Sequence, residues 1–136
     1  MLTQIPQALA GYLTMKISRN AALLLLGLLF AALLVGTQIP GAWRDEAFRV
    51  AHLPWEMNKV AHFSIFAAMA WLSHADPLRF SVARVLGLAL LLACLTEGLQ
   101  FYASSRDPSW TDVGIDMAGA AVGSALAHWA GRQAAP

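Results

Sequence analysis

The amino-acid sequence predicts an all-α protein that is embedded in a membrane as a bundle of four transmembrane helices. Hydrophobic residues make up 58% of the 136 residues and charged residues only 12%, which is about half of the charged share of an average soluble protein. The mean hydropathy of +0.56 agrees with this composition. A small soluble domain has to cover a large surface with polar groups, and this chain has too few of them. Its outer surface is therefore expected to face lipid.

The composition also argues against several classes of function. The formal net charge is only +1 and the sequence has no basic stripe, so nucleic acid is not an expected partner. The single cysteine, Cys94, cannot form an intrachain disulfide, and a zinc site built on several thiolates is excluded. No cofactor is expected, because the sequence contains no nucleophile elbow, phosphate-binding glycine loop or dinucleotide fingerprint.

The first predicted span covers residues 21–39 and ends at Pro40. A bilayer core takes about 20 apolar residues, whereas the apolar core of a signal peptide has only about 7 to 15. No small-x-small cleavage site follows this run, so a retained membrane anchor is expected rather than a signal peptide. Residues 1–20 would form an N-terminal cytoplasmic segment, in which Met15 is an alternative start.

Three further helices are expected at residues 58–74, 80–102 and 111–130. A polar loop over residues 43–58 leads into the first of them, Pro77 ends it, and a tight loop over residues 104–109 precedes the last. Because no linker or change of composition interrupts these segments, residues 21–132 are expected to form one transmembrane domain. Tryptophans near the segment ends are expected at the membrane–water interface, namely Trp43, Trp55, Trp110 and Trp129.

The basic residues indicate the orientation of this bundle. If the helices alternate in direction, five basic residues fall on one side of the membrane and four on the other. The counts become five and two if Lys59 and Arg106 belong to a site instead of to the loops. The positive-inside rule then predicts that both termini are cytoplasmic, in a multi-pass protein of the inner (cytoplasmic) membrane. The two groups are Lys16, Arg19, Arg79, Arg84 and Arg132, and Arg44, Arg49, Lys59 and Arg106.

The alternating topology brings polar residues together at the extracytoplasmic ends of three helices. The second helix begins there, the third ends there and the fourth begins there, so these residues share one depth. A charge at the bilayer centre costs about 2.5–3.5 kcal/mol on insertion scales, so such acids usually face the interior of the protein. The candidate ligand-binding site consists of Lys59, His62, Glu97, Gln100, Arg106, Asp112 and Asp116.

The fourth helix indicates how this group packs. Successive steps of four, three and four residues place two acids and two glycines on one helix face, namely Asp112, Asp116, Gly119 and Gly123. The segment from Gly119 to Gly123 is a small-xxx-small surface, which permits close approach of another helix. The face that carries the acids is therefore expected to pack inward.

Four blocks of sequence carry a resemblance to a known family. They are Asn58-Lys59-Val60-Ala61-His62-Phe63, then Glu97-Gly98-Leu99-Gln100, then Arg106, and Thr111-Asp112-Val113-Gly114-Ile115-Asp116-Met117-Ala118-Gly119-Ala120. In order and spacing they resemble the VanZ-like membrane proteins, a family of small bacterial multi-pass proteins named for a member associated with teicoplanin resistance. The family pattern is Asp-Lys-x-x-His-Phe, Asp-Glu-x-x-Gln, Pro-Gly-Arg and Asp-x-x-x-Asn-x-x-Gly. The match spans about residues 58–124.

The sequence departs from this pattern in four places. Asn58 replaces the first aspartate, Thr96 the aspartate before Glu97, Ser104-Ser105 the Pro-Gly pair, and Asp116 the asparagine. The last change adds a second acid to the fourth helix, where it could share a proton with Asp112. The resemblance implies a protein of the bacterial cell envelope with a link to antibiotic resistance or to surface glycoconjugates. It implies no particular reaction, because the family has no agreed one.

Three functions fit these residues. In the first, the site binds the polar part of a membrane lipid or a lipid-linked glycoconjugate, with Lys59 and Arg106 holding phosphate or carboxylate. In the second, the protein is a membrane-embedded hydrolase or transferase on the same ligands, with Glu97 or His62 as general base and Arg106 stabilising an anion. In the third, the polar residues only fix helix register and the choice of membrane protein partners. Whether the protein is an enzyme stays open at this point.

Simpler roles compete with ligand contact at single positions. Asp112 lies three residues after Ser109 and fits a capping box. His62 could be a core histidine bonded to Glu97. His62, Glu97, Asp112 and Asp116 are possible metal ligands by type, but no paired-ligand spacing supports a metal site and none is predicted.

Overall fold

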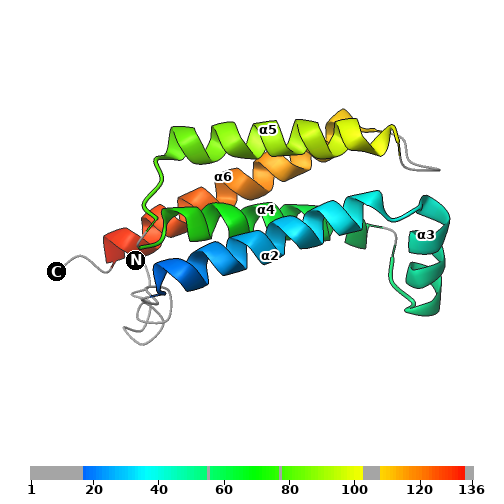
Figure 1. Cartoon of the computed structure of the whole chain (residues 1–136), viewed down its shortest axis with the longest axis horizontal. Coiled ribbons are helices and arrows are strands. Elements are labelled where there is room, and N and C mark those ends of the chain that lie inside the picture. Colours follow the sequence, from blue (N-terminus) through cyan, green and yellow to red (C-terminus); the bar gives the residue numbers. More distant parts are fainter. Residues whose placement is uncertain (1–16, 55, 77, 103–107, 134–136) are drawn as a thin grey trace, which may run out of the picture.

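The computed structural model describes residues 17–54, 56–76, 78–102 and 108–133. All regular structure in these residues is helical (Figure 1). The helices are α2 (Arg19–Gln38), α3 (Gly41–Val50), α4 (Met57–His74), α5 (Val82–Gln100) and α6 (Trp110–Gln133). The predicted all-α class is confirmed. The four expected helices correspond to α2, α4, α5 and α6, with ends displaced by at most three residues.

The segment 43–58, expected to be a polar loop, is partly helical, and this expectation was wrong. Helix α3 begins after Pro40, whose fixed φ suits the position before a first helical turn. Arg49 forms a hydrogen-bonded ion pair with Glu46 one turn earlier, at 2.6 Å, which supports the short helix. The helix is followed by His52, which has a positive φ of 54°. The high polarity of this segment concealed a helix of only ten residues.

The four long helices run lengthwise beside one another, and α3 crosses the end of the bundle (Figure 1). Helix α6 packs along α4 and α5, and α2 packs against α4 and α5. The first residues of α2 and the last residues of α6 lie at the end opposite α3 (Figure 1). The beginning of α4, the end of α5 and the beginning of α6 therefore meet at the same end as α3.

The closest approach is between α4 and α6. A Cβ atom added at Gly119 would overlap the backbone carbonyl of Phe63, and one added at Gly123 would overlap that of Ala67. The predicted small-residue surface is thus confirmed as the face on which α6 meets α4. This contact sets the depth and rotation of the polar residues on both helices.

We expect Gly119→Ala to lower the thermal stability of the purified protein. The new methyl group would force α4 and α6 apart, and overpacking of this kind costs about 1–3 kcal/mol. Gly87→Ala is the matched control, because a Cβ at Gly87 would meet nothing within 4 Å. There the usual helix preference for alanine should leave stability unchanged or raise it by about 0.5–1 kcal/mol. Equal melting temperatures for the two variants in one detergent would contradict this packing.

The bundle exposes many large apolar side chains and buries several polar ones together with an apolar core. Large apolar side chains are exposed along the long helices, among them Leu24 (64%), Leu28 (57%) and Leu91 (66%). The interior contains polar side chains, namely Thr37, His62, Thr96, Glu97, Gln100, Asp116 and Ser124. A lipid environment accounts for both features, since it accepts apolar surface and excludes unpaired polar groups.

Among the helices of the described residues, α2 and α5 are long and apolar enough to cross a bilayer. Only 17% of the most apolar 18-residue segment of α2 and 22% of that of α5 are buried inside the protein. The core helix of a soluble domain would be mostly buried. These two helices alone are weak evidence for a membrane protein. Four membrane crossings and the cytoplasmic location of both termini stay predictions.

Candidate functional site

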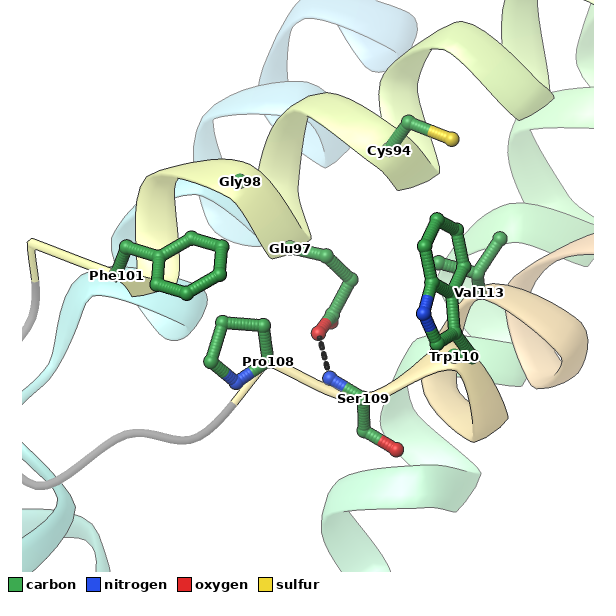
Figure 2. Close-up of a pocket in the computed structure, with 8 residues that line it drawn as sticks. All are labelled: Cys94, Glu97, Gly98, Phe101, Pro108, Ser109, Trp110 and Val113. Carbon is green, nitrogen blue, oxygen red and sulfur yellow. Dashed lines mark hydrogen bonds between the residues drawn. The ribbon is translucent and has the colours of Figure 1, made fainter.

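Glu97 lies at the end of α5, where α5 meets the beginning of α6. It is only 5% exposed, and each carboxylate oxygen accepts a hydrogen bond. Oε1 accepts from the side-chain amide of Gln100 at 2.8 Å, one turn along the same helix. Oε2 accepts from the backbone N–H of Ser109 at 2.7 Å, which joins α5 to the residue just before α6 (Figure 2).

The bond from Ser109 to Glu97 differs from the capping box that the sequence around Ser109 predicts. The Ser109 hydroxyl accepts a hydrogen bond from the backbone N–H of Thr111 at 3.2 Å, as a helix-capping serine does. In a capping box the N–H of Ser109 would bind the carboxylate of Asp112. Here it binds Glu97 from another helix. The capping-box interpretation of Asp112 was therefore wrong in its reciprocal half, because a tertiary contact takes that position.

His62 and Asp116 form a buried pair between α4 and α6. Nδ1 of His62 lies 3.0 Å from Oδ1 of Asp116, and the two residues are 5% and 0% exposed. Oδ2 of Asp116 has no hydrogen-bond partner in the described part of the chain. An ionised carboxylate can only accept, so this form of the pair has the imidazole proton on Nδ1. The alternative in which His62 bonds to Glu97 is wrong for this structure.

The other predicted site residues have different positions. Asp112 is half-buried and close enough to both His62 and Glu97 to interact with them electrostatically. Lys59 is half-buried on α4, one turn before His62. Arg106 lies outside the described residues. The structure therefore brings together the predicted residues His62, Glu97, Gln100, Asp112 and Asp116. Residues 17–54, 56–76, 78–102 and 108–133 contain no group of three or more His, Cys, Asp or Glu side chains that could hold a metal ion.

A cavity of about 210 Å³ opens beside Glu97, between the end of α5 and the beginning of α6. Figure 2 shows the Glu97 carboxylate pointing into the space between these elements, with aromatic and proline rings around it. Phe101 and Trp110 are 76% and 85% exposed, so the walls continue onto the outer surface of the bundle. The lining residues are Cys94, Glu97, Gly98, Phe101, Pro108, Ser109, Trp110 and Val113.

Sequence reasoning missed most of these walls. Trp110 was interpreted only as an interfacial residue, and Phe101 and Pro108 were not considered. Their signal was their place at the two ends of the loop that follows Glu97, since both ends of such a loop must lie near it. Conversely, the predicted residues His62 and Asp116 do not line this cavity.

A second polar cluster, at the opposite end of α4 and α6, was also missed. Nδ1 of His74 lies 2.9 Å from the carbonyl oxygen of Phe80, to which it can only donate. Its Nε2 lies 3.0 Å from the hydroxyl of Ser124. Nδ1 of His128 lies 3.0 Å from the Ser124 carbonyl oxygen, and the rings of His128 and His74 meet in a T-shaped arrangement. These contacts tie the chain after α4 to α6.

Comparison with known families supports the resemblance in the sequence. A family model described as VanZ/LLP1 matches residues 3–131. The chain belongs to the VanZ/LLP1 family. Membership of this family suggests a membrane protein, in agreement with the exposed apolar surface of α2 and α5. Searches of curated proteins and of solved structures gave no match.

The VanZ-like pattern has asparagine where this VanZ/LLP1 protein has Asp116. The pairing of His62 with Asp116 shows which hydrogen bond the residue at this position makes. The asparagine of the VanZ-like pattern could accept the same hydrogen bond through its amide oxygen. Aspartate keeps the bond and places a carboxyl group in the buried position. The expected proton sharing between Asp112 and Asp116 has no support among the described contacts, since Asp116 bonds to His62.

Proposed function

We propose that this VanZ/LLP1 protein binds the polar part of a lipid-linked or cell-envelope amphiphile in the cavity beside Glu97. In this proposal the protein is a multi-pass protein of the inner membrane, with helices α2, α4, α5 and α6 crossing it. The cavity then lies at the extracytoplasmic end of the bundle. The observation that carries the proposal is a cavity that combines one buried acid with aromatic walls reaching the outer surface of an apolar bundle.

The chemistry of the cavity favours a particular kind of head group. Each carboxylate oxygen of Glu97 already accepts one hydrogen bond and can accept another. Hydroxyl, amide and ammonium groups of a ligand would supply the donors. The rings of Phe101 and Trp110 would pack on the faces of a sugar or on the first part of a lipid chain.

This ligand chemistry differs from the first prediction, in which Lys59 and Arg106 hold a phosphate. No basic side chain lines the cavity within the described residues. Because the Glu97 carboxylate accepts hydrogen bonds, we favour recognition through hydrogen-bond donors of the ligand. The link of the member for which the family is named to teicoplanin resistance favours glycolipids, lipid-linked glycoconjugates or lipoglycopeptides as the class to test first.

The test is to fill the cavity without removing Glu97. A Cβ at Gly98, which lines the cavity, would meet nothing within 4 Å, so Gly98→Phe can place its ring there. Gly87→Phe is the matched control, because Gly87 lies on the same helix, is equally unobstructed and does not line the cavity. We expect native mass spectrometry to detect a defined head-group class on the wild type and Gly87→Phe, and at least a tenfold loss on Gly98→Phe.

Melting temperatures of the three proteins establish that each is folded. Identical, nonselective lipid on all three would contradict the binding proposal. It would favour the third function, in which the polar residues only fix helix register and partner choice.

A second candidate function is catalysis on the same ligand class, and one observation favours it. A buried carboxylate beside Nδ1 of a histidine is the arrangement that prepares Nε2 as a general base in hydrolase triads. His62 does not line the Glu97 cavity, so this function requires the ligand to extend beyond the cavity to His62. Once the cavity ligand is identified, wild type and His62→Gln should be incubated with it. Turnover by the wild type alone, with equal binding by both, would establish an enzyme. Binding without turnover by either protein would leave a binding protein.

A further inference from the structure

Helix α3 packs against no other helix in the described part of the chain. It nevertheless has an apolar stripe at spacings of four and three residues, formed by Trp43, Ala47 and Val50. Trp43 is 73% exposed and Val50 66% exposed. Exposed apolar side chains do not stabilise a monomer in water. We therefore expect this stripe to bind a partner.

The position of α3 indicates which partner. The helix crosses the end of the bundle instead of running along it (Figure 1). It follows closely on α2, and the last exposed large apolar residues before α3 are Val35 on α2 and Ile39 just after α2. The stripe of α3 therefore begins only a few residues beyond the last exposed apolar side chains associated with α2.

The charges of α3 are arranged to tolerate a partly dehydrated environment. Two arginines and two acids cancel, so the helix has no formal net side-chain charge. The charges are also paired within the helix, Arg44 with Asp45 at 2.7 Å and Arg49 with Glu46 at 2.6 Å. Pairing reduces the cost of bringing charged groups close to lipid. A neutral helix with paired charges has no need of anionic lipid.

We propose that α3 is an interfacial helix. It lies in the plane of the membrane surface at the end of the bundle that carries the Glu97 cavity, with the Trp43–Ala47–Val50 stripe in the acyl boundary. The partner is the lipid surface itself, and zwitterionic lipid is sufficient. The proposal requires that α2 and α5 lie in the bilayer, but it does not require the cavity to bind a ligand.

The test uses spin labels at two alanines in a Cys94→Ala background, which removes the only native cysteine. Ala47→Cys places the label in the stripe. Ala42→Cys is the matched position, because Ala42 is also exposed and shares a face with Asp45 and Arg49 at spacings of three and seven residues. Leu91→Cys on α5 reports whether the bundle itself is in lipid, since Leu91 is 66% exposed.

The proteins are measured in phosphatidylcholine nanodiscs by collision with oxygen, which partitions into lipid, and with a nickel chelate, which stays in water. We expect the oxygen-to-nickel ratio to be several-fold higher at residue 47 than at residue 42, and highest at residue 91. A water-like ratio at residue 47 with a lipid-like ratio at residue 91 would overturn the interfacial helix. A residue 47 shielded from both reagents would also overturn it, in favour of a protein partner. A water-like ratio at residue 91 would reject the membrane placement on which both this inference and the proposed function rest.

Discussion

Replacing Glu97 by leucine should destabilise the protein more than any other single change in the site, whereas Glu97→Gln should keep it folded. Leucine removes both acceptors and leaves the N–H of Ser109 and the amide of Gln100 without partners. An orphaned buried donor costs about 1–3 kcal/mol. Glutamine keeps one carbonyl oxygen for Ser109, and the amide of Gln100 can turn to offer its oxygen to the new NH₂ group.

The two substitutions separate folding from ligand recognition. We expect Glu97→Gln to melt close to the wild type and to lose the co-purifying ligand by about tenfold, a difference of about 1.4 kcal/mol. Loss of the Glu97 charge should weaken a hydrogen bond from an amide or ammonium group of the ligand more than it weakens an apolar contact. Melting temperature and ligand occupancy should be measured on the same samples. If Glu97→Gln retains full ligand occupancy, the Glu97 charge has no part in binding.

Replacing Asp116 by leucine while keeping His62 should cause the second large loss of stability. Asp116→Leu orphans the Nδ1 group of a histidine that is 5% exposed, at a cost of about 1–3 kcal/mol. Asp116→Asn should be neutral or stabilising, because its amide oxygen replaces Oδ1 and a buried amide costs less than a buried carboxylate. Thermal unfolding in one detergent compares the two.

A double-mutant cycle gives this pair a sharper test. His62→Leu with Asp116→Leu replaces both polar partners by apolar groups, which can be nearly neutral. The double variant should therefore be more stable than the sum of the two single losses, with a coupling of about 0.5–3 kcal/mol. Additive losses would show that the 3.0 Å contact between His62 and Asp116 contributes nothing to stability.

Helix positions and the meeting of the polar residues could be predicted because they depend on local properties. Long apolar runs bounded by Pro40 and by polar loops define where helices begin and end. Glu97, His62 and Asp116 were placed at one end of the bundle by counting alternate helix directions. The face of α6 followed from the 3.6-residue period that aligns Asp116 with Gly119 and Gly123.

The sequence prediction was wrong at α3 because this segment is highly polar. Ten residues with four charges gave no apolar run, and the segment was interpreted as a loop. Its helix is supported by the start after Pro40 and by the pairing of Glu46 with Arg49, each a small local effect. A stripe of only three apolar residues becomes visible once the backbone is known to be helical.

The sequence by itself determined the helical class, the apolar outer surface and the set of polar residues that meet at one end of the bundle. Only the tertiary structure decided that His62 pairs with Asp116, that Glu97 holds the N–H of Ser109, and that rings from Phe101 and Trp110 form walls around a cavity. The reason is geometric. Hydrogen bonding needs donor and acceptor within about 3 Å, and the rotation and depth of each helix depend on the close contact of Gly119 and Gly123 with α4.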